Sequence, residues 1–245
     1  MYIDVHCHLD LSKDIDKDVK NADSKGVGII VTQGTNSETN KKALELAKKY
    51  KVVKVALGFY PIDAINASDE EIDDEIDFIR KNKDKIVAIG EVGLDLKETD
   101  QIDKQSKIFQ KFIDLSMELD KPIIIHSRKA EKEAIEMLEK SKARKVIMHV
   151  FSGKVSLVKK IMGNKWYVTI PTNVKHSEQF QNIVKDVPLS QLLCETDSPY
   201  LHPDKKFPNE PANVIESYKK IAELRKITLK EVEKTIEDNY KKLFS

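Results

Sequence analysis

The sequence predicts an α/β protein folded as one (β/α)8 barrel of the TIM type with C-terminal helices, over residues 1–245. Short β-branched or apolar runs alternate about eight times with longer segments of helical period. Several runs are apolar nearly throughout, such as Ile123-Ile124-Ile125, as expected for parallel strands covered on both faces. A doubly wound open sheet is the main rival, but no glycine-rich phosphate-binding loop follows the first run.

The composition is that of a folded domain without a strong charge bias. The chain is 40% hydrophobic and 34% charged, which is enough to bury a sizeable core, and no low-complexity linker divides it. Lys and Arg number 42 and Asp and Glu 41, for a net charge of +1. The whole molecule therefore does not attract nucleic acid or membranes electrostatically, and any polyanion must be held locally.

The two cysteines and the lack of targeting segments indicate the compartment. Cys7 and Cys194 both lie in apolar runs, and we expect no disulfide between them. The sequence shows neither a signal segment nor a long apolar span. We therefore expect a reduced, soluble, cytoplasmic protein that does not bind membranes. Because no exposed apolar stripe is evident, we also expect a monomer.

The predicted elements follow in order along the chain. Strands are expected at residues 3–8, 27–33, 52–59, 86–92, 122–127, 145–151, 166–171 and 192–197. Ser68-Asp69-Glu70-Glu71 is a capping box that precedes a helix at 72–80, and Thr99 precedes one at 102–119. After the eighth strand come a helix at 210–226 and a second capping box, Thr228 to Glu231, before a helix ending at Leu243.

Two histidines lie at the end of the first predicted strand. Side chains alternate between the faces of a strand, so His6 and His8 point to one side and Cys7 to the other. Neutral imidazole is the commonest metal ligand among side chains. The pair alone is also compatible with two ordinary polar residues, so the remaining ligands must come from elsewhere in the chain.

Further polar residues close other predicted strands. In a barrel of this type the active site lies at the carboxyl ends of the strands, where such residues converge. These residues are Glu91, His126, His149 and Asp197, at the ends of strands four, five, six and eight. A carboxylate inside an apolar stretch such as the one before Glu91 costs several kcal/mol unless it is paired or bound to a cation.

Together these residues predict a metal site. The ligand candidates are His6, His8, Glu91, His126, His149 and Asp197. Six donors exceed what one tetrahedral ion needs, and they suit two ions that share a carboxylate, with positions left for water and substrate. The other two histidines, His176 and His202, fall in predicted loops and are expected to be solvated or locally hydrogen-bonded.

At this point the sequence resembles the TatD family of metal-dependent hydrolases, within the amidohydrolase superfamily. The resemblance spans nearly the whole chain. The motifs that carry it are His6-Cys7-His8, Gly90-Glu91-Val92-Gly93-Leu94-Asp95, Ile125-His126-Ser127-Arg128, His149-Val150-Phe151-Ser152-Gly153, Glu195-Thr196-Asp197-Ser198-Pro199-Tyr200 and Asn209-Glu210-Pro211.

The resemblance implies a β/α barrel, two divalent cations and hydrolysis of DNA phosphodiesters, with exonuclease character. By residue, it implies one ion on His6, His8, Glu91 and Asp197, and another on Glu91, His126 and His149. Glu91 then bridges the ions, where many members of the superfamily carry a carboxylated lysine.

Two segments depart from the family pattern. Tyr60 stands before Pro61, where many family members have histidine, so the role of that histidine in substrate contact or proton transfer is in doubt here. Tyrosine can still donate a hydrogen bond to a phosphate or stack on a base. Residues 167–172 lack the glycines common in the family, which could alter the loop after the seventh strand.

The expected mechanism is in-line attack of an activated water on phosphorus between two ions. Asp197 is expected to orient that water and take its proton, with Glu91 as the second catalytic residue. Arg128 lies two positions after His126 and can bind a phosphate oxygen if the strand continues, although an exposed start to the next helix is an alternative.

Residues in the loops at the same end could contact the nucleic acid. They are Phe151, Phe207, Lys154, Lys205 and Lys206, for each of which packing or solvation is the more ordinary role. With almost no net charge, modest and salt-sensitive binding to single strands or strand ends is expected rather than binding to long duplexes.

Other functions remain open from the sequence. The same ions could hydrolyse a lactone, an amide or an aminoacyl ester, because scaffolds of this type host many chemistries. A barrel that only stores metal is the non-enzymatic alternative, and it would predict missing ligands. Imidazole favours Zn²⁺ or Mn²⁺, whereas phosphodiester chemistry with carboxylates is also compatible with Mg²⁺.

Overall fold

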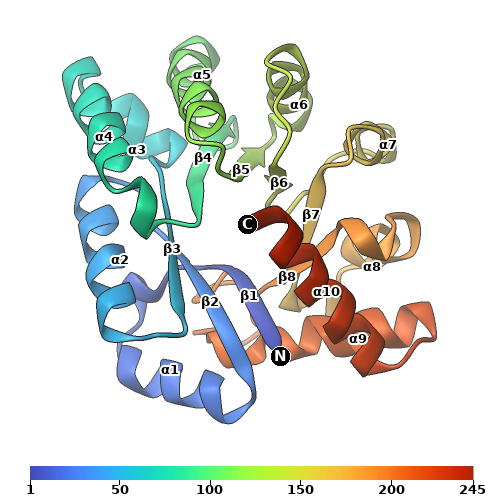
Figure 1. Cartoon of the computed structure of the whole chain (residues 1–245). Helices are drawn as coiled ribbons and strands as arrows, with labels where there is room; N and C mark the ends of the chain where they lie inside the picture. Colours follow the sequence, from blue (N-terminus) through green and yellow to red (C-terminus); the bar gives the residue numbers. More distant parts are fainter. Residues whose placement is uncertain (245) are drawn as a thin grey trace.

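The computed structural model describes residues 1–244, which form a nearly closed eight-stranded parallel barrel with helices around it (Figure 1). The predicted (β/α)8 fold with C-terminal helices is thereby confirmed. The strands follow one another around the barrel in sequence order. The last and first strands meet through backbone hydrogen bonds, from Asp197 N to His6 O at 2.9 Å and from His8 N to Ser198 O at 2.8 Å.

The strands are short and mostly buried. They are β1 Tyr2–Cys7, β2 Val27–Gln33, β3 Val53–Leu57, β4 Ala88–Asp95, β5 Ile123–Arg128, β6 Val146–Met148, β7 Tyr167–Pro171 and β8 Leu192–Glu195. Every residue of β4, β6, β7 and β8 is buried, because helices cover the outside of the barrel and side chains fill its inside.

The helices surround the strands, with two more after β8. They are α1 Ile15–Ser24, α2 Ser37–Lys49, α3 Pro61–Asn66, α4 Asp69–Lys81, α5 Ile102–Glu118, α6 Glu131–Lys140, α7 Val155–Gly163, α8 Glu178–Asp186, α9 Ile215–Arg225 and α10 Leu229–Phe244. Thr228 and Glu231 cap α10 reciprocally: Glu231 Oε2 accepts from Thr228 N at 2.8 Å, and Thr228 Oγ1 accepts from Glu231 N at 3.2 Å.

Several predicted boundaries were wrong. α9 begins at Ile215 rather than at residue 210, because Pro211–Val214 forms a 3-10 turn. β4 runs on to Asp95, beyond the predicted residue 92. β6 and β8 end at Met148 and Glu195, short of the predicted 151 and 197.

The reason for the early ends of β6 and β8 is the backbone that follows them. Val150 has φ of 40° and Asp197 has φ of 52°, in the left-handed region that a strand cannot pass through. A non-glycine residue held there costs about 1–3 kcal/mol and persists only when its surroundings determine it. His149 and Asp197 therefore lie on sharply turned segments just past the strands.

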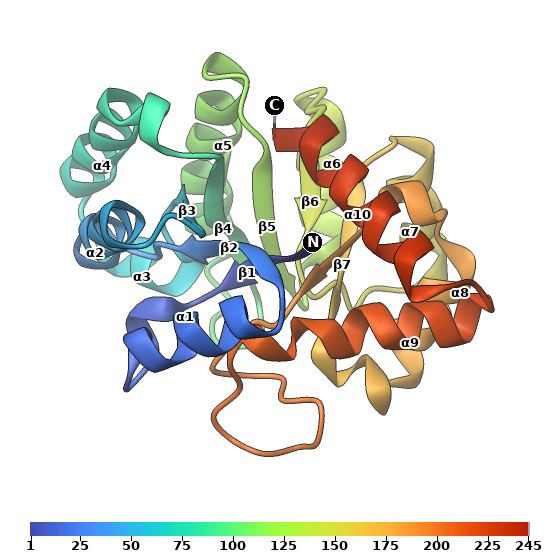
Figure 2. The ribbon, with the colours of Figure 1, turned by 60° about the horizontal axis from the view of Figure 1, so that its bottom comes forward.

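One end of the barrel is covered and the other is open. α10 crosses the amino end, where Asn239 Nδ2 donates to Leu189 O and Leu192 O at 2.8 Å (Figure 1). The amino group of Met1 pairs there with Glu233 and Glu237 of α10. The loop of residues 196–210 projects from the opposite end (Figure 2). Residues at the carboxyl ends of the strands are therefore the ones that reach a cavity.

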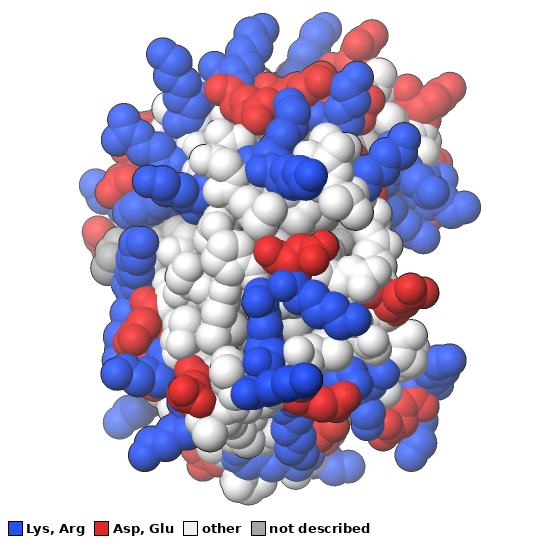
Figure 3. Space-filling model, turned by 90° about the vertical axis from the view of Figure 1, so that its right-hand side faces the viewer, with Lys and Arg blue, Asp and Glu red and all other residues white. Residues whose placement is uncertain are grey.

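The outer surface carries both signs of charge. On the face that Figure 3 shows, Lys and Arg interleave with Asp and Glu around a band of uncharged residues. This face has no field of a single sign, in keeping with the net charge of +1. Within residues 1–244 no helix has the length and apolar character that crossing a membrane would require.

Candidate metal centre

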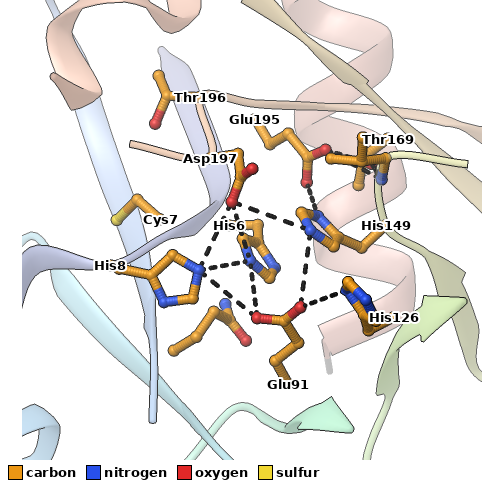
Figure 4. Close-up of polar contacts among 12 residues, drawn as sticks. His6, Cys7, His8, Glu91, His126, His149, Thr169, Glu195, Thr196 and Asp197 are labelled. Atoms are coloured by element: carbon orange, nitrogen blue, oxygen red, sulfur yellow. Dashed lines mark hydrogen bonds and ion pairs between the residues drawn. The ribbon is translucent and has the colours of Figure 1, made fainter. Parts of the chain in front are cut away.

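The six predicted ligands meet inside the carboxyl end of the barrel. Figure 4 shows them pointing toward one another from separate strand ends. They are His6, His8, Glu91, His126, His149 and Asp197. All except His126 and Asp197 are buried by residue, and the side chain of Asp197 keeps 14% of its surface exposed. Five different strands supply them, so their convergence requires the closed barrel.

Four donors form a compact first set. His6 Nε2 lies 3.3 Å from His8 Nε2, and it lies 3.6 Å from both Glu91 Oε2 and Asp197 Oδ1. His8 Nε2 lies 3.5 Å from the same two carboxylate oxygens. Donors of a tetrahedral ion with bonds of about 2.0–2.2 Å are about 3.3–3.6 Å apart. The separations in this set match that geometry, so these residues fit one divalent ion.

The second set lies on the other side of Glu91. Glu91 Oε1 is 2.9 Å from His126 Nδ1 and 3.8 Å from His149 Nε2. The three donor atoms lie within 4.8 Å of one another, as do those of the first-set residues His6, His8 and Asp197. The two oxygens of Glu91 therefore face two different groups of imidazoles, which is the arrangement that a bridging carboxylate needs.

The electrostatics favour positive charge at this centre. Burial alone would raise the pKa of Glu91, but hydrogen bonds from His126 and His6 hold it well below its usual value. Burial likewise would lower the pKa of His149, but the charge of Glu195 and a hydrogen bond with it raise the pKa to about 10. The carboxylates thus hold protons on the imidazoles, in positions where a divalent cation would provide the same compensation.

Glu195 was not among the predicted site residues, although it orients one of them. Its Oε2 lies 2.8 Å from His149 Nδ1, and its Oε1 accepts from Thr169 Oγ1 at 2.7 Å and from Val150 N at 3.2 Å. Glu195 is fully buried. The signal was its position two residues before Asp197, at the end of an apolar run. A carboxylate behind a metal-ligating histidine fixes the direction of the ring.

Asp95 was missed for a related reason, because β4 was predicted to end at residue 92. Asp95 Oδ2 lies 2.9 Å from His126 Nε2 and accepts a hydrogen bond from the hydroxyl of Tyr60 at 3.0 Å. Burial alone would raise the pKa of Asp95, but hydrogen bonds from His126 and from the N–H of Lys97 lower it to about 2. Asp95 therefore remains charged and fixes both His126 and Tyr60.

Asp4 connects the two strands that close the barrel. Its carboxylate accepts from Thr196 N at 2.9 Å, from Thr196 Oγ1 at 2.6 Å and from His6 N at 3.3 Å. Asp4 is fully buried, two residues before His6 on the same face of β1. It therefore fixes the position of the β8 end, and with it Asp197, relative to His6.

The predicted substrate contacts line one cavity with the centre. Tyr60 and Arg128 border a cavity of about 830 Å³ that also contains Glu91, His126 and Asp197. β5 continues through Arg128, whose side chain is 52% exposed and lies 3.2 Å from Glu98. After β7 the chain enters a 3-10 turn, Thr172–Lys175, in the segment that lacks the family glycines.

The remaining candidates separate into buried and exposed residues. Phe151 was predicted as a possible stacking residue, but it is fully buried in the core and cannot contact a nucleic acid. Phe207 is 69% exposed. Lys154, Lys205 and Lys206 are exposed as well. His176 is exposed, and His202 Nδ1 accepts from Asp204 N at 3.0 Å, as expected of residues outside the centre.

An eight-stranded parallel barrel with imidazoles and carboxylates converging at its carboxyl end has the architecture of a metal-dependent hydrolase. Comparison with known proteins agrees with this class. The family model described as TatD related DNase matches residues 3–245. The chain therefore belongs to the TatD family and is a metal-dependent hydrolase of ester bonds that uses divalent metal.

Individual relatives cover the same length. The chain is 37% identical to an uncharacterized metal-dependent hydrolase of Methanocaldococcus jannaschii, over 99% of this chain and 96% of the relative. It is 32% identical to the human deoxyribonuclease TATDN3, over 99% of this chain and 94% of the relative. The crystal structure of the Escherichia coli TatD homolog YjjV superposes with a TM-score of 0.93 at 26% identity, covering 99% of this chain and 97% of that chain.

Proposed function

We propose that this protein hydrolyses phosphodiester bonds of DNA at strand ends, with two divalent ions that share Glu91. The observation that carries the proposal is the orientation of Glu91, whose Oε2 faces His6 and His8 while its Oε1 faces His126 and His149. The name of the human relative, deoxyribonuclease TATDN3, and the family description support DNA as the substrate.

The ligands divide between the two ions along this line. The first ion would be held by His6, His8, Glu91 and Asp197, and the second by Glu91, His126 and His149. Divalent cations in such a set supply Lewis acidity, which lowers the pKa of water and neutralises charge that develops on the phosphate. The imidazole-rich set favours Zn²⁺ or Mn²⁺, and Mg²⁺ is the third candidate.

Asp197 is the proposed general base. Its Oδ1 lies 3.6 and 3.5 Å from the Nε2 atoms of His6 and His8, which hold the carboxylate in place. The side chain remains 14% exposed and lines the cavity, so it reaches an attacking water. It would take the proton of that water as the oxygen approaches phosphorus.

Tyr60 and Arg128 are the proposed phosphate contacts. The hydroxyl of Tyr60 donates to Asp95, which aims it across the cavity next to His126. Arg128 is paired with Glu98 at the cavity rim, and its guanidinium can exchange this exposed carboxylate for a phosphate oxygen. Surface ion pairs of this kind contribute little, so the exchange costs little.

A strand end fits this cavity better than a long duplex. In the part of the chain that the structure describes, Arg128 is the one Lys or Arg side chain that lines it, alongside Asp10 and Asp63. Binding along many phosphates requires a track of cations. Binding of one terminal nucleotide requires the metal centre and a few neighbouring contacts.

The test is hydrolysis of end-labelled single- and double-stranded DNA by metal-stripped protein resupplied with Mg²⁺, Mn²⁺ or Zn²⁺. We expect stepwise shortening with at least one ion. Removal of a general base lowers a rate by about 10²–10⁴-fold, so Asp197→Asn should fall by this factor. Asp103→Asn changes an exposed aspartate on α5 and is the matched control.

The variants separate true activity from contaminating nuclease. Equal cutting by wild type, Asp197→Asn and Glu91→Ala, or no cutting by any of them, would reject DNA as the substrate. The same preparations should then be assayed on lactone, amide and aminoacyl-ester substrates, which the same centre could hydrolyse.

A further inference from the structure

Two exposed aromatic rings lie beside the metal centre. Tyr200 is 50% exposed and Phe207 is 69% exposed, and their ring centroids are 6.5 Å apart. We refer to this pair as the Tyr200–Phe207 shelf. The ring of Tyr200 also lies 6.4 Å from the ring of His8, in an edge-on arrangement. The shelf therefore begins one side chain away from a predicted metal ligand.

The shelf connects two cavities that meet at His8. Tyr200 lines the large cavity that holds Glu91 and Asp197. Phe207 lines a second cavity of about 180 Å³, and His8 and Leu11 border both. Leu11 is itself 49% exposed. Large apolar side chains that are exposed together next to a catalytic cavity are typical of a ligand-binding surface.

The loop that carries the shelf is anchored at several points. Tyr200 N donates to Asp197 O at 2.8 Å, and Asn209 N donates to Pro199 O at 2.8 Å. Thr172 Oγ1 donates to Leu201 O at 2.6 Å. Tyr200 is thus tied directly to the backbone of the proposed general base. The exposed rings are held by the fold rather than by contacts between themselves, which makes them available to a ligand in a fixed position.

We infer that the Tyr200–Phe207 shelf stacks the nucleobase next to the scissile phosphate. This inference rests on the proposed function, which places a phosphodiester between the two groups of ligands. One sugar separates a phosphate from its base, and one ring separates the centre from the shelf. Every nucleobase has a π face, so stacking on aromatic side chains tolerates any sequence.

The charges around the shelf favour a base over a further phosphate track. Lys13 and Lys17 border the second cavity, but Asp14 and Asp18 border it as well. The large cavity adds one arginine. Stacking would therefore contribute more than ionic contacts to holding the terminal nucleotide, and discrimination between a base and no base should depend weakly on salt.

The first test compares two oligonucleotides that differ only in whether the terminal nucleotide is abasic. Stacking on an aromatic side chain corresponds to about a 5- to 150-fold effect per base. We expect kcat/KM of the wild type to favour the base-bearing strand by this factor, and we expect the preference to shrink toward 1 in Tyr200→Leu and Phe207→Leu. Tyr200→Phe keeps the ring and should restore the preference.

The second test needs no hydrolysis. The probe is 2-aminopurine deoxyriboside 5′-monophosphate, which contains no phosphodiester and whose fluorescence is quenched on stacking. With metal-loaded protein we expect quenching by wild type and Tyr200→Phe, and weaker binding by Tyr200→Leu and Phe207→Leu.

The outcomes distinguish the shelf from the proposed function. If wild type cuts DNA but treats base-bearing and abasic ends alike, or if the leucine variants keep the preference, the shelf is rejected and the nuclease proposal stands. If wild type cuts no DNA, the nuclease proposal fails. In that case, quenching that is lost in the leucine variants would support a nucleobase site, and absence of quenching would reject it.

Discussion

Oε2 of Glu195 lies 2.8 Å from Nδ1 of His149, so the imidazole is held with its Nε2 toward Glu91 and Asp197. The ring of His149 also stacks on that of His6 at a centroid distance of 3.6 Å. The second group of ligands therefore depends on a carboxylate that lies behind it, and this dependence leads to the first prediction.

Glu195→Gln should weaken metal binding about 10- to 100-fold, because loss of a carboxylate behind a ligating histidine has effects of this size. The amide cannot accept from His149, Thr169 and Val150 in the way that the carboxylate does. Affinity is measured by competition with a coloured chelator. Glu45→Gln, an exposed carboxylate paired with Lys48, is the control and should bind metal as wild type does. Unchanged affinity in Glu195→Gln would contradict the orienting role.

Glu91→Gln should lower the amount of bound metal below that of the wild type, because its two oxygens face both groups of ligands. Metal content is measured by mass spectrometry after dialysis. Binding should also release protons from the wild-type imidazoles, whose protonation the carboxylates favour.

Metal should also stabilise the wild type, by about 2.7 kcal/mol when the free ion is at 100 times its Kd. The measurement is the free energy of unfolding in urea, with and without the ion. The gain should shrink in Glu91→Gln. An equal gain in both proteins would mean that the ions bind elsewhere.

Asp4→Ala should destabilise the protein by about 1–3 kcal/mol for each buried donor left unpaired, of which Thr196 N is the clearest. Asp4→Asn keeps one acceptor and should cost less. Both are measured by urea unfolding. If the alanine variant proves as stable as the wild type, Asp4 does not hold β1 and the end of β8 together.

Gly93→Ala should be destabilising and should displace His126. Gly93 has φ of 143°, and a Cβ on it would overlap the backbone carbonyl of His126. The strained backbone alone accounts for about 1–3 kcal/mol. Gly163→Ala, at the end of α7 with nothing within 4 Å, is the matched control and should be neutral or stabilising. Equal thermal stability of the two variants would be inconsistent with this steric account.

Cys7 and Cys194 should resist thiol reagents in the folded protein and react once it is unfolded. Both are buried free thiols, and burial raises the pKa of each well above its usual value. The folded thiols therefore stay protonated where unfolded thiols ionise, from about pH 8.5 upward. The free energy of unfolding should consequently fall as the pH rises above this range. Rapid labelling of either cysteine in native protein at pH 8 would show that it is accessible.

The sequence by itself determined the barrel and its six predicted ligands. Both are properties of local pattern: apolar runs alternate with helical segments, and a polar residue such as Glu91 or His126 at the end of a run has one place to go in a parallel barrel. The alternation of side chains on a strand placed His6 and His8 on one face.

Only the tertiary structure decided which residues support that centre and which face the cavity. Glu195 meets His149, and Tyr60 meets Asp95, from different strands or loops, so their partners follow from how distant segments pack. Phe151 and Phe207 looked alike as loop aromatics, yet one is fully buried and the other is 69% exposed. Burial depends on the turned backbone beyond each strand and on its neighbours in space, and no local pattern encodes either.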